Sequence, residues 1–428
     1  MSQEIATEVK EENKMGTMPV GKLIFNMSLP MMVSMLVQAL YNIVDSIFVA
    51  KLSENALTAV SLAFPLQTLL IAVGAGTGVG MNALLSKSLG EKNFKKANDT
   101  AANAAVLYIL SYILFLILGF SVVKPFYLSQ IGNADVEIME MGIEYLSTVM
   151  IFSFGLFTQF FFERLLTSTG RTIFSMTSQL TGAVTNIILD PIFIFGLDLG
   201  IKGAAIATVI AQFISASWVL HFLFSDKAIY RIKKSCMKLD FKLIKEIISL
   251  GFSGFVFATT GSLVQIVCNN VLLFWGGNIY VGIMTVLNSI RDVLQMTIEG
   301  IRSGAQPVIS YNYGAGQYLR VRQGIKFLTK IALLYTSIAW CILDFFPEFF
   351  IHLFNSEEEM LLLGVPALHI YFLGFFMMAF QSAGQTTFIS LGMGKYATFF
   401  SLFRKVILVI PLTIFLPNLW DLGVYGVF

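Results

Sequence analysis

The sequence predicts an all-α polytopic membrane protein built from two six-helix bundles, and its composition and apolar segments support that prediction. Of its 428 residues, 56% are hydrophobic and only 13% are charged, and the mean hydropathy is +0.76. Soluble domains carry about 25% charged residues, and a membrane-spanning helix needs about 20 predominantly apolar ones. Eleven segments qualify: 23–50, 57–86, 98–123, 138–163, 171–196, 201–224, 246–274, 279–303, 327–346, 361–388 and 396–417.

The two ends of the chain lie outside these segments. Residues 1–18 are polar and do not form a secretory signal, so the first apolar segment is expected to remain as a membrane helix. At the other end, a further apolar stretch begins at Leu422 and stops at Phe428. We therefore expect a twelfth helix that is largely missing from this chain.

Basic residues follow every second predicted span. They are Lys87, Lys92, Lys95 and Lys96 after the second, Arg164 and Arg171 after the fourth, Lys227, Arg231, Lys233, Lys234 and Lys238 after the sixth, Arg320 and Arg322 after the eighth, and Lys395 after the tenth. Basic residues in short loops gather on the cytoplasmic side of a membrane. This rule predicts a multi-pass protein of the plasma membrane with a cytoplasmic N-terminal tail, residues 1–20.

The second half of the chain repeats the first with a period near 224 residues. The repeat pairs Gly76, Gly80, Ser86 and Gly90 with Gly300, Gly304, Ser310 and Gly314, and it places Asp45 opposite Asn269. Because six spans per repeat is an even number, both halves enter the membrane in the same direction, as in transporters with parallel repeats. We predict an N-lobe at 21–225, a cytoplasmic linker at 226–245 and a C-lobe at 246–428.

Asp190 places a carboxyl group inside the otherwise apolar run 186–195. An ionised side chain at the bilayer centre costs about 2.5–3.5 kcal/mol on insertion scales, and such residues usually serve a function. Pro191 removes one helix hydrogen bond and is expected to bend the helix. Asn186 lies four residues before Asp190, on the same helix face. Such a group of oxygens suits Na⁺ or a shared proton, and a neutral, structural aspartic acid is the alternative.

The first span carries a second carboxyl group, Asp45, at the end of a polar stripe. Gln38, Tyr41 and Asn42 precede it at helical spacing, and we predict that they line a substrate cavity. Pro30 lies earlier in the same span and is expected to bend the helix. Polar side chains can instead bond neighbouring helices together, and that alternative stays open. Two lone carboxylates in one half predict a cation-coupled transporter.

The glycine run 74–80 is the one stretch that resembles a nucleotide-binding loop. No predicted strand precedes it, so we predict close helix packing through Gly76 and Gly80 instead. The three cysteines share no metal-ligand or disulfide spacing. We expect no enzyme activity, no cofactor and no nucleic-acid partner.

The charged residues of the eighth span are expected to have structural or gating roles. Glu299 and Arg302 are three residues apart and should pair on one helix face. Arg291 and Asp292 are adjacent, so we expect that they do not face each other. Glu163, at the end of the fourth span, is expected to be structural as well.

Several strings, in their order and spacing, resemble the multidrug and toxic compound extrusion (MATE) family over nearly the full chain. They are Ser28-Leu29-Pro30 with Asp45, residues 162–172, residues 186–191 with 199–205, Gly304-Ala305-Gln306-Pro307 with 311–315, and Arg404-Lys405-Val406 before Pro411. The resemblance implies two six-helix lobes around a central cleft that work by alternating access. It also implies export of lipophilic, mostly cationic compounds in exchange for H⁺ or Na⁺, by a protein that we expect to be a monomer in the lipid bilayer.

The resemblance further implies where the coupling ion binds. In the branch of the family whose coupling acids lie in the N-lobe, the matching residues are Asp45 and Asp190. An asparagine and a threonine of that site match Asn186 and Thr208, so these four residues are the expected Na⁺ or H⁺ site. Another branch keeps a carboxylate in the seventh span, where this chain has amides such as Asn269.

Two other functions remain as alternatives. A flippase of lipid-linked saccharides or other amphiphiles can also use two six-helix bundles, but it would need several cationic side chains to hold a pyrophosphate. The N-terminal half carries acids in its spans instead. A sensor or receptor that uses this scaffold without transporting anything is the other alternative.

Overall fold

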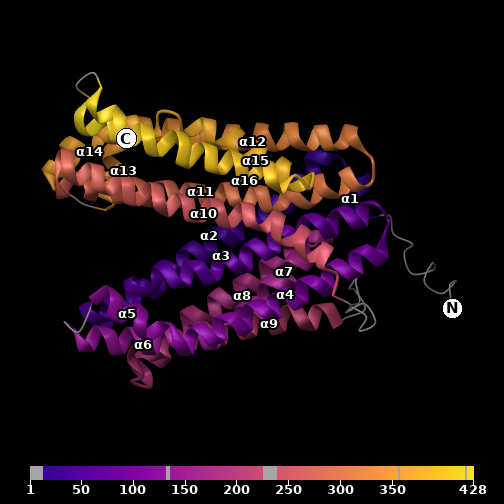
Figure 1. The fold of residues 1–428 in the computed structure, drawn as a ribbon, viewed down its shortest axis with the longest axis horizontal. Coiled ribbons are helices and arrows are strands. Elements are labelled where there is room, and N and C mark those ends of the chain that lie inside the picture. Colours follow the sequence, from indigo (N-terminus) through magenta and orange to yellow (C-terminus); the bar gives the residue numbers. More distant parts are fainter. Residues whose placement is uncertain (1–12, 132–134, 225–238, 355–356, 420–421) are drawn as a thin grey trace.

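The computed structural model describes residues 13–131, 135–224, 239–354, 357–419 and 422–428, which form helices and no strand. Two helical bundles, one coloured indigo to magenta and the other salmon to yellow, meet near α1 and diverge toward the opposite end (Figure 1). The predicted all-α architecture with two lobes is therefore confirmed.

The N-lobe contains α2 to α9, preceded by the short helix α1. Their bounds are α1 (Lys14–Thr17), α2 (Val20–Leu52), α3 (Glu54–Gly90), α4 (Phe94–Ser121), α5 (Val123–Ile131), α6 (Val136–Ile151), α7 (Phe154–Ser168), α8 (Thr172–Pro191), the π-helix η1 (Ile192–Gly196) and α9 (Gly200–Phe224). The predicted span at 138–163 consists of two helices, α6 and α7, at 44° to each other.

The C-lobe contains the helices that follow residue 240. They are α10 (Phe241–Gly276), α11 (Asn278–Gly314), α12 (Tyr318–Phe345), α13 (Pro347–His352), α14 (Glu358–Phe372), η3 (Phe375–Met377), α15 (Met378–Ser390), α16 (Gly394–Leu402), the π-helix η4 (Phe403–Val409), α17 (Ile410–Phe415), η5 (Leu416–Asn418) and η6 (Gly423–Val427).

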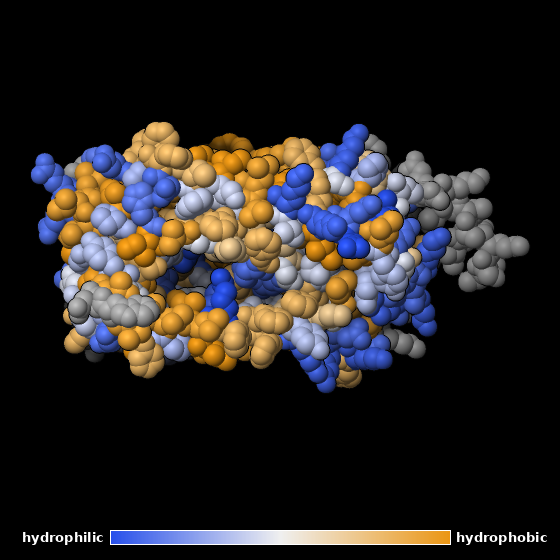
Figure 2. All heavy atoms as spheres, turned by 90° about the horizontal axis from the view of Figure 1, so that it is seen from above, coloured by the Kyte–Doolittle hydropathy of each residue, from blue (hydrophilic) through white to orange (hydrophobic). Residues whose placement is uncertain are grey.

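Nine helices among the described residues are long and apolar enough to cross a membrane, and α6 with α7 forms a tenth candidate. Helix α11, which covers the predicted span 279–303, carries four charged side chains and is not among these candidates; it packs against α2, α3 and α12. Figure 2 shows hydrophobic side chains over the middle of one face and hydrophilic ones gathered toward its ends. This distribution is the one that a multi-pass membrane protein needs.

Three segments differ from the prediction or lie outside the described residues. Helix α10 begins at Phe241, where the Asp240 carboxylate accepts hydrogen bonds from the backbone of Lys242 and Leu243, so the last five residues of the predicted linker are helical. Residues 226–238 of that linker and 1–12 of the tail lie outside the described residues. Where the start of a twelfth helix was expected, the structure has the short 3₁₀ helix η6. Short helical segments often adopt 3₁₀ geometry.

The two lobes touch through reciprocal glycine contacts. A Cβ atom added to Gly90 would lie 1.9 Å from the Tyr311 carbonyl oxygen, and one added to Gly314 would lie 2.0 Å from that of Lys87. The internal repeat relates Gly90 to Gly314 and Lys87 to Tyr311, so the same contact occurs twice. We call the region formed by these four residues the closed end.

The glycine run in α3 extends this contact along the helix. A Cβ atom on Gly80 would lie 2.1 Å from the Ile247 carbonyl oxygen, and one on Gly76 would lie 3.1 Å from that of Gly251. Both partners belong to α10 of the other lobe. The prediction of close helix packing is confirmed, and the structure adds that the packing joins the two lobes.

Residues Lys14–Met18, which we call the N-terminal strap, cross the closed end. Met15 is fully buried, and its carbonyl oxygen accepts hydrogen bonds from Asn312 Nδ2 at 3.0 Å and Arg320 NH2 at 3.1 Å. Arg320 also donates to the Met18 carbonyl oxygen at 2.7 Å. The strap is therefore bonded to the C-lobe, while Lys14 and Met15 lie against Gly170 of the N-lobe.

We expect Arg320→Ala to release the N-terminal strap. The variant loses hydrogen bonds from a charged donor, each worth about 1.5–3 kcal/mol, so amide exchange across the strap should accelerate by roughly tenfold or more. Hydrogen exchange with mass spectrometry measures this directly. Arg322→Ala, at an exposed position on the same helix, is the control, and equal exchange in both variants would show that Arg320 does not hold the strap.

Candidate cation-coupling site and substrate cavity

Asp190 lies where the helical geometry of the fifth span changes. It is the second-last residue of α8, and Pro191 is the last. The π-helix η1 follows, with the Leu197 amide donating to the Ile192 carbonyl oxygen at 2.8 Å. Pro191 lacks an amide donor, so the preceding α-helical hydrogen-bond pattern cannot continue unchanged through it. Single π-helical turns are frequent at functional sites, and here one begins two residues after a fully buried acid.

Asn186 links Asp190 to the neighbouring helix α9. Its Nδ2 atom donates to Asp190 Oδ1 at 3.1 Å and lies 3.4 Å from Thr208 Oγ1. The opposite oxygens, Asp190 Oδ2 and Asn186 Oδ1, are buried and have no hydrogen-bond partner among the described residues. Buried polar atoms are normally satisfied, so this pair of oxygens has the chemistry to accept a proton or to bind a hard cation.

Asp45 belongs to the same electrostatic environment. Helix α2, which carries Asp45, packs against α8, which carries Asp190, so the two carboxyl groups act on each other electrostatically. The Asp45 Oδ1 atom is also buried without a hydrogen-bond partner, and neither acid forms an ion pair with another described residue. The structure therefore brings the two predicted acids together in a setting that does not neutralise them.

A cavity opens beside this group of residues and contains about 590 Å³ of empty space, part of it open to solvent. Its lining consists of Ser34, Gln38, Tyr41, Leu156, Gln159, Phe160, Glu163, Gln179, Gly182, Ala183, Asn186, Thr208, Ala211 and Gln212. Gln38 and Tyr41 were predicted to line a cavity, and the structure places them there together with two residues of the predicted ion site.

Asn42 and Pro30 do not line this cavity, and the bend expected at Pro30 stays a prediction. Asn42 is exposed and does not line the cavity, because one helical step from Tyr41 turns a side chain by about 100°. Pro30 lies inside α2, which continues from Val20 to Leu52 without a break. The Pro30 carbonyl oxygen accepts a hydrogen bond from Ser34 Oγ, one turn later in the helix, at 3.0 Å.

Glu163 is a cavity residue that the sequence did not identify. Only 4% of it is exposed, and its carboxylate accepts hydrogen bonds from Gln159 Nε2 and Gln179 Nε2, both at 2.8 Å. A structural role was expected because Glu163 stands beside Arg164 near a helix end. The missed signal was an amide four residues before a buried acid, the same spacing that links Asn186 to Asp190.

The expectation for Arg291 and Asp292 was wrong. Arg291 donates to Asp292 Oδ1 through NH2 at 2.8 Å and through Nε at 3.1 Å. Adjacent Cβ atoms do point apart on a helix, but the arginine side chain is long enough to reach the carboxylate of its neighbour. The expected pair of Glu299 and Arg302 is confirmed at 2.5 Å.

Comparison with known proteins points to one family. The MatE family model matches residues 30–192 and 254–415, and the starts of the two matches are 224 residues apart. The multidrug export protein MepA of Staphylococcus aureus (strain MSSA476) is 24% identical over 410 residues, which cover 94% of this chain and 89% of that protein. MepA of Staphylococcus haemolyticus (strain JCSC1435) is 25% identical over 417 residues, with coverages of 94% and 88%.

Solved structures share the fold. The crystal structure of MATE in complex with MaL6 superimposes with a TM-score of 0.91 at 23% identity, covering 98% of this chain and 94% of that one. The outward-facing conformation of a multidrug resistance MATE family transporter gives the same TM-score and identity, with coverages of 98% and 93%. Because the family model matches well over half of the chain, in two segments that follow the internal repeat, this chain belongs to the MATE family of efflux transporters.

Proposed function

We propose that this protein exports lipophilic, mostly cationic compounds in exchange for H⁺ or Na⁺, with Asp45, Asp190, Asn186 and Thr208 as the coupling site. The observation that supports this most strongly is the set of unpartnered buried oxygens on the two acids and on Asn186. It requires no cofactor other than the coupling ion. The name of the similar MepA proteins, multidrug export protein, agrees with this assignment.

Competition for negative charge is the proposed basis of exchange. When Asp45 and Asp190 are both ionised, their like charges repel each other in a medium of low dielectric constant. A proton or a Na⁺ ion at Asp190 relieves that repulsion, and a cationic compound in the adjoining cavity relieves it as well. If ion and compound stabilise states that face opposite sides, their competition drives antiport.

The orientation follows from the charges of the closed end. Lys87 belongs to it, and Lys92 and Arg320 lie near it along the chain. The rule for basic loops assigns such an end to the cytoplasm. The N-terminus would then be cytoplasmic, the host membrane the plasma membrane, and the divergent ends of the lobes would face outward.

Transport of a cationic dye in everted membrane vesicles tests the proposal. Vesicles containing the protein should accumulate ethidium when a gradient of H⁺ or Na⁺ is imposed. A protonophore should abolish uptake if H⁺ is the coupling ion, and a Na⁺ ionophore should abolish it if Na⁺ is. Dye movement that ignores both gradients would contradict ion-coupled efflux and favour the flippase alternative, which lipid-linked saccharides would then test.

Glu163→Gln is expected to weaken binding of cationic compounds. The variant removes a negative charge that lines the cavity and keeps a side chain of the same shape. A loss of about 1–2 kcal/mol of electrostatic attraction corresponds to a roughly five- to thirtyfold higher Kd. Tetraphenylphosphonium binding to purified protein measures it, with Glu140→Gln at an exposed position of α6 as the control. An unchanged Kd would remove Glu163 from the site.

A further inference from the structure

The C-lobe contains cations that the proposed coupling site does not use. Arg404 and Lys405 are partly buried on the π-helix η4. Lys405 Nζ donates to the Phe257 carbonyl oxygen at 2.5 Å and lies 3.7 Å from the centre of the Phe257 ring. The Arg404 guanidinium carbon is 5.9 Å from the same ring centre. Both cations therefore lie within 6 Å of the centre of the Phe257 ring.

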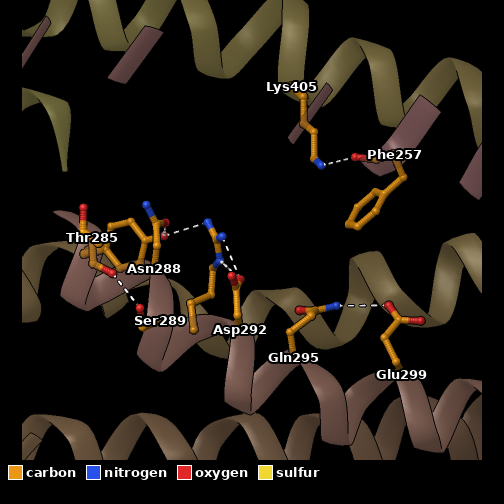
Figure 3. Close-up of polar contacts among 10 residues, drawn as sticks. Phe257, Thr285, Asn288, Ser289, Asp292, Gln295, Glu299 and Lys405 are labelled. Carbon is orange, nitrogen blue, oxygen red and sulfur yellow. Dashed lines mark hydrogen bonds and ion pairs between the residues drawn. The ribbon is translucent and has the colours of Figure 1, made fainter. Parts of the chain in front are cut away.

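These positive charges are not neutralised by the described residues around them. Neither Arg404 nor Lys405 forms an ion pair there, and Arg404 Nε is buried without a hydrogen-bond partner. In Figure 3, Lys405 and Phe257 point toward a row of polar side chains on α11. The acids of that row, Asp292 and Glu299, are already paired with Arg291 and Arg302.

Arg291 is a third cation of the C-lobe, and Asp292 balances its charge. Its guanidinium acts electrostatically on both Arg404 and Lys405. It is held in place by Asp292 and by the Tyr371 hydroxyl at 2.9 Å, which in turn donates to Asn288 Oδ1 at 2.8 Å. Arg404 and Lys405 are therefore the two C-lobe cations at Phe257 that have no ion-pair partner among the described residues. Charged residues within membrane helices often mark ligand pathways.

A second cavity begins at Arg404 and contains about 670 Å³ of empty space, part of it open to solvent. Much of its lining is aromatic (Phe380, Phe388, Phe400 and Phe403), and its polar residues are Gln381, Gln385, Ser401 and Arg404. The rings of Phe388 and Phe400 are stacked at 5.5 Å with only 12° between their planes. The cavity therefore combines an aromatic lining with an arginine that has no ion-pair partner among the described residues.

We propose that this C-lobe cavity binds amphiphiles that carry an anionic group, a carboxylate, sulfonate or phosphate. Arg404 would contact the oxyanion, because a guanidinium matches the geometry of such groups. Lys405 would strengthen the positive field, and the phenylalanine rings would hold the apolar body. The protein would then accept acids or zwitterions in the C-lobe as well as cations in the N-lobe, and this site does not depend on the proposed coupling ion.

Binding of 2-naphthoate tests the site. Full-length protein in phosphatidylcholine nanodiscs should bind 2-naphthoate about tenfold or more tightly than uncharged 2-naphthamide, which has the same ring system. Arg404→Gln should bring the two Kd values together, and Arg404→Lys should restore part of the difference. Lys395→Gln, on the exposed side of α16, should leave the ratio unchanged, and tetraphenylphosphonium binding should confirm that each variant is folded.

The same measurement separates a lipid headgroup from a free amphiphile. If phosphatidylglycerol in the nanodisc weakens naphthoate binding in the wild type and has no effect in Arg404→Gln, the anionic group comes from lipid. If it has no effect in either protein, the site takes a free amphiphile. A wild-type protein that binds acid and amide equally in phosphatidylcholine, with no effect of phosphatidylglycerol, would overturn the proposal.

Discussion

Asp190→Asn is expected to abolish the response of efflux to an ion gradient. Asparagine keeps the shape of the side chain and an oxygen that can accept the hydrogen bond from Asn186 Nδ2, but it cannot be ionised. The variant therefore resembles a site that is permanently neutral, and a gradient of H⁺ or Na⁺ can no longer change the charge at this position. Coupling free energies are typically about 1–3 kcal/mol, so gradient-driven ethidium uptake should fall by roughly tenfold or more.

Two comparisons make this result specific. Glu144→Gln, at an exposed position of α6, removes a negative charge elsewhere in the N-lobe and should transport normally. Tetraphenylphosphonium binding to Asp190→Asn should be weaker because one negative charge is lost, but it should remain measurable, which would show that the protein is folded. Retention of a normal response to the imposed gradient in Asp190→Asn vesicles would show that coupling occurs elsewhere.

Thr208→Val should distinguish the two coupling ions. Valine has nearly the shape of threonine but lacks the hydroxyl that lies 3.4 Å from Asn186 Nδ2. A Na⁺ site would lose an oxygen ligand, so the Na⁺ concentration for half-maximal uptake should rise by about tenfold. A proton on Asp190 needs no such ligand, so H⁺-driven uptake should change little. A variant that is impaired equally with both gradients would indicate a packing defect rather than a lost ligand.

Gly90→Val is expected to prevent the lobes from meeting at the closed end. A Cβ atom there would lie 1.9 Å from the Tyr311 carbonyl oxygen, and backbone cannot move aside as a flexible side chain can. Overpacking of this kind costs about 1–3 kcal/mol or more, which shifts the conformational equilibrium by about 5- to 150-fold. Since alternating access requires each end to close in turn, transport should be lost.

The change should be visible in local dynamics as well as in transport. Hydrogen exchange at residues 86–90 and 311–315 should accelerate in Gly90→Val, and Gly90→Ala should give an intermediate effect. Gly254→Val is the matched control, because a Cβ atom on that helical glycine would meet nothing within 4 Å. Normal transport by Gly90→Val would mean that the closed end is not required in the cycle.

Much of this molecule could be read from local patterns. Spans were predictable because each needs a long apolar run regardless of its neighbours. The internal repeat was visible in pairs such as Gly90 and Gly314, whose spacing the two family matches reproduce. Asp45 and Asp190 were found because a carboxyl group within an apolar segment is costly wherever the helix packs.

Only the tertiary structure decided which side chains meet. Glu163 and Gln179, on different helices, both line the cavity, and Gln179 donates a hydrogen bond to the Glu163 carboxylate. Lys405 donates to the carbonyl oxygen of Phe257, which lies 148 residues earlier in the chain. Asn42 does not line the cavity, because its neighbour Tyr41 faces the cavity and successive side chains on a helix point about 100° apart. Apolar runs and buried acids are properties of single segments, so the sequence by itself determined the spans, the repeat and the two acids. Cavities, lobe contacts and the basic C-lobe site depend on how helices far apart in the chain pack, and no local pattern encodes that packing.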